Sequence, residues 1–230
     1  MPKRKHGLVS VIVTNYQNAN YIKACLDSIR KQSYREFELI VVDDCSTDES
    51  RHLIRHWKKR YKHRLKHRML FVSMPRNIGF PGVLNVAMYL AKGEFIAVQD
   101  GDDISHPERI EKQVDYLRQH PDIGIVGTNY RLFTEQHTTP LETPAWLAFT
   151  PGEVQAIYQN GGHCVSHGTI LFRRELFDKY GGPTRRLAGA EDYEMIAKCV
   201  QDGVGVTNLQ DVLYFYRRHD KQRSRHYYGA

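Results

Sequence analysis

The sequence predicts an α/β fold in which a mostly parallel sheet is flanked by helices. Two observations support this prediction. Short runs of Val, Ile, Leu and Phe alternate with helical patterns through the first half of the chain, and polar or acidic residues follow most of these runs directly. With 230 residues and 41% hydrophobic content, the chain can bury a sizeable core. We therefore expect one globular unit over residues 1–230.

The first half of the chain contains four strand-and-helix repeats. Each expected strand is an apolar run rich in β-favouring residues. Each expected helix has apolar residues at helical spacing, acidic residues in its first turn or a proline at its start. The expected strands cover residues 8–14, 37–43, 69–73 and 94–99. The expected helices cover residues 18–32, the segment from Thr47 onward, residues 82–91 and residues 107–120.

The pattern weakens after an expected strand at residues 123–127. Residues 129–149 contain Pro140 and Pro144 and few periodic signals, so we predict a long irregular segment, which in a compact domain is usually functional or mobile. Thr150 and Glu153 enclose Pro151 in a capping-box pattern, which predicts a helix start. The remaining predictions are a strand at 168–173, helices at 174–180 and 191–201, and β-structure at 205–216.

The formal charge of +7 is unevenly distributed. Residues 51–68 contain nine Lys or Arg and no acidic residue, and a second basic stretch covers residues 217–225. One interpretation is a solvated helix face followed by a charged tail. The other is a surface for anionic lipid head groups or another polyanion. Nucleic acid is a weak expectation, because only Trp57 and Tyr61 interleave aromatic rings with the charges.

The apolar runs are too short to span a bilayer, and the N-terminal residues do not form a secretory signal. The four cysteines are scattered without a Cys-x-x-Cys pair, which fits reduced thiols. We therefore expect a cytoplasmic protein, with peripheral contact at the inner face of the membrane through residues 51–68.

The chemistry is expected in the loops after the strands, because ligands of open parallel sheets bind at the carboxyl ends of the strands. Asp100, Asp102 and Asp103 lie within four positions and would repel one another without a cation. Such hard oxygen ligands suit Mg²⁺ or Mn²⁺. An ion that also held two nucleotide phosphates would stabilise negative charge on a leaving diphosphate. The alternative is an acidic turn that caps a helix.

The loop after the second strand offers a similar choice. Asp44 is a candidate to accept hydrogen bonds from a base or ribose, and its alternative is a cap of the following helix. Asp48 is the better candidate for a purely structural role.

Five motifs in a fixed order resemble family 2 of the glycosyltransferases. They lie at residues 10–16, 38–48, 77–79, 93–96 and 100–103, and the resemblance extends over nearly the whole chain. Each motif alone is weak, but their order and spacing are specific. The resemblance implies a Rossmann-like GT-A fold, with a nucleotide-sugar-binding half at about 1–104 and a smaller acceptor-binding half at about 105–230. It also implies inverting transfer of a sugar from a nucleoside diphosphate to a hydroxyl, in cell-surface polysaccharide or glycoconjugate assembly.

The resemblance also assigns site residues. Asp102 would bind the metal directly, with Asp100 nearer the ribose and His219 as a further ligand. Asp103 would face the donor sugar. The residues expected to contact the nucleotide-sugar are Thr14, Asn15, Tyr16, Asp44, Arg76, Asn77, Asp100, Gly101, Asp103, Glu191 and Arg218. UDP is the expected nucleotide, because uridine is the commonest donor base in the family.

Asp192 is the expected catalytic base. It follows Glu191 at a helix start, where the family has a Glu-Asp pair, and an inverting displacement needs a base opposite the departing diphosphate. The alternative is that both residues are first-turn acids that the helix dipole stabilises, without a catalytic role. A weaker possibility is a zinc site formed by His163, Cys164 and His167, but the sequence offers no fourth ligand for it.

The family's processive synthases have a Gln-x-x-Arg-Trp motif that this chain lacks, so we expect one sugar per encounter. The acceptor is expected to be a glycan, a lipid-linked molecule or a protein, bound near residues 129–149 and 161–168. Three rival hypotheses stay open: a catalytically silent nucleotide- or glycan-binding relative, a polyanion-binding protein, and a nucleotidyltransferase, although no early Gly-rich phosphate loop supports the last.

Overall fold

The fold is built on one twisted sheet with strand order β3-β2-β1-β4-β7-β6-β8-β5. The structure is a computed structural model that describes residues 5–65, 68–134, 143–184 and 191–223. Strands β1, β2, β3 and β4 pair in parallel, as do β6 and β8, whereas β7 and β5 pair antiparallel to their neighbours. The strands are β1 Lys5–Asn15, β2 Phe37–Asp43, β3 Met69–Ser73, β4 Gly93–Asp100, β5 Ile104–Ser105, β6 Ile123–Phe133, β7 Leu171–Arg173 and β8 Gly205–Arg217.

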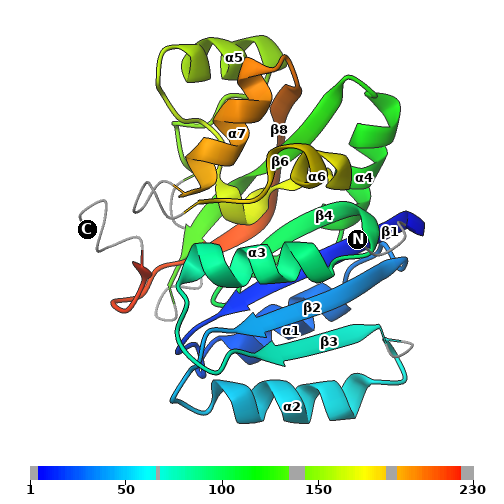
Figure 1. Ribbon diagram of the computed structural model, residues 1–230, viewed down its shortest axis with the longest axis vertical. Coiled ribbons are helices and arrows are strands. Elements are labelled where there is room, and N and C mark those ends of the chain that lie inside the picture. Colours follow the sequence, from blue (N-terminus) through cyan, green and yellow to red (C-terminus); the bar gives the residue numbers. More distant parts are fainter. Residues whose placement is uncertain (1–4, 66–67, 135–142, 185–190, 224–230) are drawn as a thin grey trace.

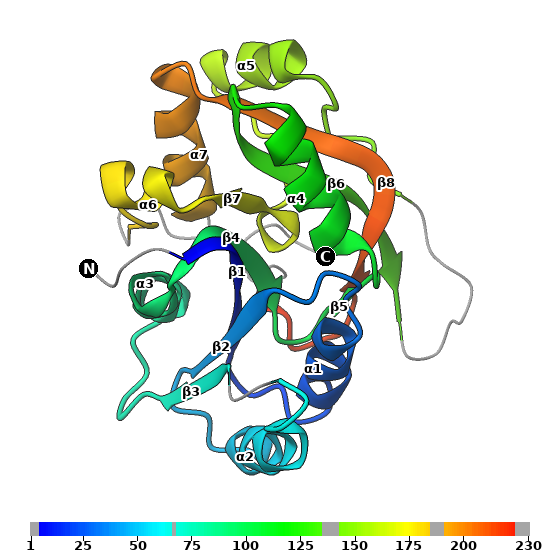
Figure 2. The ribbon, with the colours of Figure 1, turned by 90° about the vertical axis from the view of Figure 1, so that its right-hand side faces the viewer.

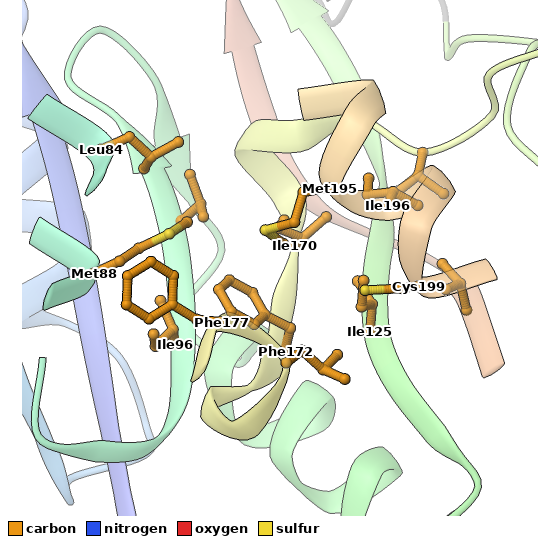
Figure 3. Close-up of a cluster of buried hydrophobic side chains, with 14 of the residues drawn as sticks. Leu84, Met88, Ile96, Ile125, Ile170, Phe172, Phe177, Met195, Ile196 and Cys199 are labelled. Atoms are coloured by element: carbon orange, nitrogen blue, oxygen red, sulfur yellow. The ribbon is translucent and has the colours of Figure 1, made fainter. Parts of the chain in front are cut away.

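Helices cover both faces of the sheet (Figures 1 and 2). The alternation along β1 shows the division: Ile12 packs with α3 and α7 on one face, while Val11 and Val13 pack with α1, α2 and α4 on the other. Figure 3 shows part of the hydrophobic cluster that contains Ile12, where side chains of α3, α6 and α7 pack together. The helices are α1 Ile22–Arg30, α2 Ser50–Tyr61, α3 Phe80–Leu90, α4 Arg109–Gln119, α5 Pro151–Gln159, α6 Arg174–Tyr180 and α7 Glu191–Gln201, with a short 3-10 helix η1 at His167–Thr169.

The α/β class and the mostly parallel sheet are confirmed, and several element boundaries shift. Helix α1 begins at Ile22 rather than at residue 18, and α2 begins at Ser50 rather than at Thr47. Helix α3 begins two residues earlier than predicted, with Pro81 in its first turn, where the missing N–H costs no helical hydrogen bond. The capping box at Thr150 is confirmed, since its side chain accepts from the Glu153 amide.

The prediction of an irregular segment at residues 129–149 is wrong at its start. Strand β6 continues to Phe133 and pairs with β8 as far as Arg217. Two register shifts interrupt this pairing around Asn129, and such bulges weaken the alternation by which a strand is recognised in a sequence. Residues 135–142 of the predicted segment lie outside the described residues.

Two smaller predictions are also corrected. The strand expected at 168–173 is shorter, because residues 167–169 form the 3-10 helix η1 and only Leu171–Arg173 join the sheet. Strand β5, two residues long, was not predicted, and it pairs with Tyr214 and Phe215 of β8. Within the residues described, we find no helix long and apolar enough to span a bilayer.

Candidate functional site

The loops after β1, β2 and β4 meet at one edge of the sheet. In the pairing register, Thr14 lies beside Val42 on one side and Asp100 on the other. Asn15 lies beside Asp43. Because parallel strands end at the same edge, the three loops that the sequence singled out are neighbours (Figure 1).

The loop after β2 is fixed by a buried network. The Asn15 amide donates to Asp43 Oδ1 at 2.7 Å, and the Ser46 backbone N–H donates to Asp43 Oδ2 at 3.0 Å. Cys45 closes the turn with a φ of 61°, in the left-handed region. Asn15 Oδ1 is buried and has no hydrogen-bond partner among the described residues. The network thus holds Asn15, Asp43 and Ser46 in one fixed arrangement.

Asp44 is buried and holds the neighbouring loop. Its two carboxylate oxygens accept from the backbone N–H groups of Ile78 and Gly79, at 2.7 and 2.8 Å. The Asn77 side chain donates to the Asp44 carbonyl at 3.3 Å. The carboxylate thus anchors the loop after β3, and its predicted contact with the nucleoside stays a prediction.

The other residues expected near the nucleoside are more exposed. Arg76 and Asn77 lie on the surface of the loop after β3, and Tyr16 is 51% exposed after β1. All three lie in the strand-end loops where the sequence predicted them. Asp48 accepts from the backbone N–H groups of Ala19 and Ser50, which supports its structural assignment.

The acidic loop after β4 lies against the end of β8. The Asp102 carboxylate lies 3.1 Å from His219 Nε2, and the Asp102 carbonyl accepts from Arg217 Nε at 2.7 Å. The buried Asp103 carboxylate accepts from the Arg217 backbone N–H at 2.7 Å. Gly101 has no room for a side chain, since a Cβ would lie 2.7 Å from the Thr14 carbonyl. Residues more than 110 positions apart therefore share one site.

The three carboxyl groups of this loop, Asp100, Asp102 and Asp103, lie close enough to repel one another when charged. Burial, together with the neighbouring Asp102 and Asp100, raises the pKa of the Asp103 carboxyl well above its ordinary value. Its Oδ2 is buried without a hydrogen-bond partner among the described residues. Asp103 faces β8 here, and the donor-sugar contact that the resemblance implied for it stays a prediction.

Asp100 lies against η1 and β8. A Cβ on Gly168 would come within 2.6 Å of Asp100 Oδ2 and 2.7 Å of the Tyr214 hydroxyl. Tyr214 is completely buried, and burial and the nearby Asp103 and Asp100 raise its pKa well above the ordinary value. The absence of a side chain at Gly168 thus lets Asp100 and Tyr214 pack closely.

A buried cation lies beneath the acidic loop. The Arg109 guanidinium donates to Gln99 Oε1 at 3.0 Å and to the Val98 carbonyl at 2.7 Å, and it lies 5.0 Å from the centre of the Tyr214 ring. No carboxylate within the described ranges is within ion-pair distance of it. Burial lowers the pKa of Arg109 to about 10. Its charge partly offsets the acidic loop above it.

The donor set at Asp102 and His219 fits a divalent cation. His219 is mostly buried, its ring lies 4.5 Å from that of Tyr21, and Nε2 points at the carboxylate. Over the residues that the structure describes, no group of three or more His, Cys, Asp or Glu side chains is gathered closely enough to enclose a metal. Mg²⁺ and Mn²⁺ sites of nucleotide enzymes commonly use one or two protein ligands together with substrate phosphates, and Asp102 with His219 matches that pattern.

The remaining predicted residues come from the C-terminal half. Glu191 and Asp192 are the first two residues of α7, and their side chains lie outside the described part of the structure. Arg218 is exposed just beyond β8, and its backbone N–H donates to the Phe133 carbonyl at 2.8 Å. Cys164 is buried, His163 Nδ1 bonds the Tyr158 hydroxyl, and the described residues form no zinc site there.

Three residues of this site were not predicted. Tyr214 contacts both Asp100 and Asp103, Gln99 bonds Ser105, and Arg109 supports Gln99 from below. Arg109 left one signal in the sequence: with Gln113 it forms a polar pair, four residues apart, beside the apolar stripe of α4. Tyr214 left none, because its alternation within β8 matches an ordinary core residue.

A basic groove lies elsewhere, between α2 and the edge strand β3. Arg55, Lys58, Lys59 and Lys62 line it at helical spacing, and Met69 and Phe71 complete the lining. Arg55 lies 5.7 Å from the centre of the Phe71 ring. None of these four cations makes an ion pair with a described residue. The predicted basic tract therefore presents a defined cationic surface.

Comparison with known proteins gives consistent matches. The family model described as glycosyl transferase family 2 matches residues 10–181. EpsE of Bacillus subtilis is 31% identical over 91% of this chain and 72% of its own length, and the O-antigen biosynthesis glycosyltransferase WbnJ of Escherichia coli is 29% identical over 96% and 84%.

Two solved structures share the fold. TarS of S. aureus, in complex with UDP-GlcNAc, has a TM-score of 0.74 at 23% identity, and PcManGT of Pyrobaculum calidifontis, in complex with GDP-Man and Mn²⁺, also has a TM-score of 0.74 at 23%. The chain spans 61% and 59% of those two chains. Both matches cover at least 95% of the present chain.

Proposed function

This chain belongs to glycosyl transferase family 2, and from that premise we propose that it transfers a sugar, with inversion and with a divalent metal, from a nucleoside-diphosphate sugar to a hydroxyl of a glycan, lipid-linked or protein acceptor. The pair Asp102–His219, 3.1 Å apart at the strand-end edge, is the observation that carries the proposal. WbnJ is named for O-antigen biosynthesis, and another relative, AmsE of Erwinia amylovora, is named for amylovoran biosynthesis. These names suggest a surface polysaccharide as the product.

The proposed site divides the work along the chain. Residues 1–104 hold the donor: Asp44 and Asn77 shape the loop beside the nucleoside, Asp100 lies near the ribose, and Arg76 and Tyr16 remain exposed to contact the base or phosphates. Residues 105–230 hold the acceptor. Strand β8 also ends beside Asp102, which places His219 next to that carboxylate. UDP is the proposed nucleotide, and GDP is the first alternative because one structural neighbour binds GDP-Man.

Asp102 and His219 would hold Mn²⁺ or Mg²⁺, with Asp100 as a further ligand. Such an ion neutralises the negative charge that develops on a departing diphosphate. Arg218 is exposed beside His219 and would add a cation to the same phosphates. The buried contacts of Arg217 with Asp102 and Asp103 keep the acidic loop in place before the donor binds.

Asp192 is the proposed base. It lies in the first turn of α7, the end at which the helix dipole is positive. The carboxylate would accept the proton of the acceptor hydroxyl while that oxygen attacks the anomeric carbon and the diphosphate leaves from the opposite face. Glu191, beside it, would contact the donor sugar.

The test is nucleotide binding measured by calorimetry. UDP, GDP, dTDP and CDP are titrated with and without Mn²⁺, and the best pair is repeated with Asp102→Ala and His219→Ala. We expect one nucleotide to bind in a metal-dependent manner and each substitution to weaken the binding at least tenfold. Absence of binding for all four nucleotides would overturn the proposal and favour the polyanion-binding alternative. Nucleotide binding without any sugar transfer, and unchanged by Asp192→Ala, would favour the catalytically silent relative.

A second, accompanying function is peripheral attachment to an anionic membrane at its cytoplasmic face. The basic groove between α2 and β3 favours it, because cations at one surface are each attracted by about 1 kcal/mol to anionic head groups. Attachment of this kind would bring the site to a lipid-linked acceptor.

A further inference from the structure

A row of aromatic rings connects the acidic loop to the start of α7. Trp146 lies 6.4 Å from Tyr130 and 5.4 Å from His163 between ring centres. His163 in turn lies 5.9 Å from Tyr193, and Tyr193 stacks on Tyr158 at 5.3 Å with 12° between the ring planes. These spacings are those of directly packed aromatic pairs. The five rings therefore pack in one continuous series, which we call the aromatic row, and Tyr130 and Tyr158 are buried within it.

Both ends of the row lie at parts of the proposed site. Tyr193 follows Asp192 immediately in the first turn of α7. At the other end, Tyr130 clusters with Tyr214, whose hydroxyl is 3.3 Å from the Asp100 backbone N–H. The row thus extends from the helix of the proposed base to the acidic loop.

One ring of the row, that of Trp146, faces solvent. Trp146 is 41% exposed, although large aromatic side chains normally stabilise a protein by being buried. Its indole N–H donates to the Tyr130 hydroxyl at 3.0 Å, so the polar atom of the ring is already satisfied. What remains accessible is an apolar ring face held in a fixed orientation. Fixed, exposed aromatic faces of this kind are typical of ligand-binding surfaces.

We propose that the exposed face of Trp146, held in place by the aromatic row, is a platform on which a pyranose ring of the acceptor lies. The C–H groups on one face of a sugar ring carry partial positive charge and pack against the electron-rich face of an aromatic ring. The hydroxyls around the rim of the sugar ring stay free to bond water. The inference rests on the proposed function and specifies its acceptor as a saccharide.

The two tryptophans of the chain make a direct test feasible. Trp57→Phe leaves Trp146 as the single fluorescent indole, and Trp146→Phe leaves Trp57, which is 3% exposed against α1. Both variants are first checked by thermal melting and by titration with UDP and Mn²⁺. Methyl glycosides of glucose, galactose, mannose and N-acetylglucosamine are then added to the nucleotide-bound protein.

We expect at least one glycoside to change the emission of Trp146 saturably, and none to change that of Trp57. Calorimetry with the same glycoside should show about tenfold weaker binding for Trp146→Ala and a smaller loss for Trp146→Phe, which keeps a ring. UDP binding should be unchanged in all these variants.

The outcomes separate the two proposals. If UDP binds but no glycoside alters Trp146 emission, the aromatic row is not an acceptor platform and the proposed function stands. If a glycoside alters Trp146 emission but no nucleotide binds, Trp146 is part of a saccharide-binding surface, and both the transferase proposal and the acceptor role of that surface fail. If neither ligand binds, both are overturned.

Discussion

Cys45 shows the cost of a left-handed residue at the site. Its φ of 61° closes the turn between Asp43 and Ser46, and a side chain is disfavoured in that region by about 1 kcal/mol. Cys45→Gly should therefore raise the free energy of unfolding by up to about 1 kcal/mol, with the greater freedom of glycine in the unfolded chain limiting the gain. Chemical denaturation measures the change. Cys45→Ala is the control, and an equal gain there would contradict the explanation.

Asp48 illustrates a carboxylate whose effect depends on pH. Partial burial raises its pKa, but hydrogen bonds from Ser50 and Ala19 outweigh burial and hold the pKa below the ordinary value. A lowered pKa means that the stabilisation is present above the unfolded value of 3.8 and is lost as pH falls through the folded value. Asp48→Ala should lower the free energy of unfolding by about 1 kcal/mol at neutral pH. Denaturation curves for both proteins should converge in acid, and a pH-independent difference would contradict this account.

At the level of single residues, a sequence singles out groups whose chemistry is local. Asp100, Asp102 and Asp103 could be singled out because three acids in four positions are unusual whatever the fold. Tyr214 and Arg109 could not, because their roles depend on β8 and α4 being brought beneath the acidic loop by long-range pairing. Asp44 is intermediate: the sequence identified it as a hydrogen-bond acceptor, and the structure adds the loop amides that it accepts from.

At the scale of elements, the short helix η1 sets the position of Asp100. Gly168 lets that helix lie against β4, and the Cβ of Gly168→Ala would come within 2.7 Å of both Asp100 Oδ2 and the Tyr214 hydroxyl. We expect the acidic loop to shift and UDP–Mn²⁺ affinity to fall by about tenfold, or roughly 1.4 kcal/mol. Calorimetry measures the loss. Gly152→Ala in α5 is the matched control, because nothing lies within 4 Å of its added Cβ. Equal UDP–Mn²⁺ affinities in Gly168→Ala and Gly152→Ala would show that the close packing of Gly168 against Asp100 and Tyr214 does not affect nucleotide binding.

Elements were predictable in proportion to how regular their patterns are. Strands β1 to β4 carry uninterrupted apolar runs, so their positions agree with the sequence to within a few residues. Strands β6 and β8 are interrupted by bulges, and their pairing is defined by partners about 80 residues away, so the continuation to Phe133 left no local signal. Strand β5 is too short for any pattern to reveal it.

At the scale of the whole molecule, general rules of α/β folds predict part of the sheet order from the sequence and leave the rest open. Alternating strands and helices predicted parallel pairing, and the strand-end rule predicted which loops would meet. The insertion of antiparallel β7 between β4 and β6 was not predictable, because its three residues give no orientation. That insertion places η1 beside β4 and so completes the site around Asp100.

The basic groove lies on the edge of the same sheet, where β3 has a neighbour only on its β2 side among the described strands. Lys58 and Lys59 line it, and charge attraction to an anionic surface is expected to contribute about 1 kcal/mol for each. Lys58→Gln/Lys59→Gln should therefore weaken binding to phosphatidylglycerol-containing vesicles by about 2 kcal/mol, on the order of thirtyfold, with no change in UDP binding. Co-sedimentation with vesicles measures the difference.

The matched control removes the same charge outside the groove. Lys5→Gln/Lys92→Gln changes two exposed lysines at the start of β1 and beside β4 and should leave vesicle binding within about threefold of the parent protein. Added salt should weaken the parent's binding, because exposed charges are screened within about 10 Å at 0.1 M ionic strength. Equal retention on neutral and anionic vesicles would exclude membrane attachment through the charges of the basic groove. Salt-sensitive binding to a soluble polyanion with no retention on anionic vesicles would assign the groove to that ligand instead. Either result would leave the proposed nucleotide site, at the carboxyl ends of the strands, unaffected.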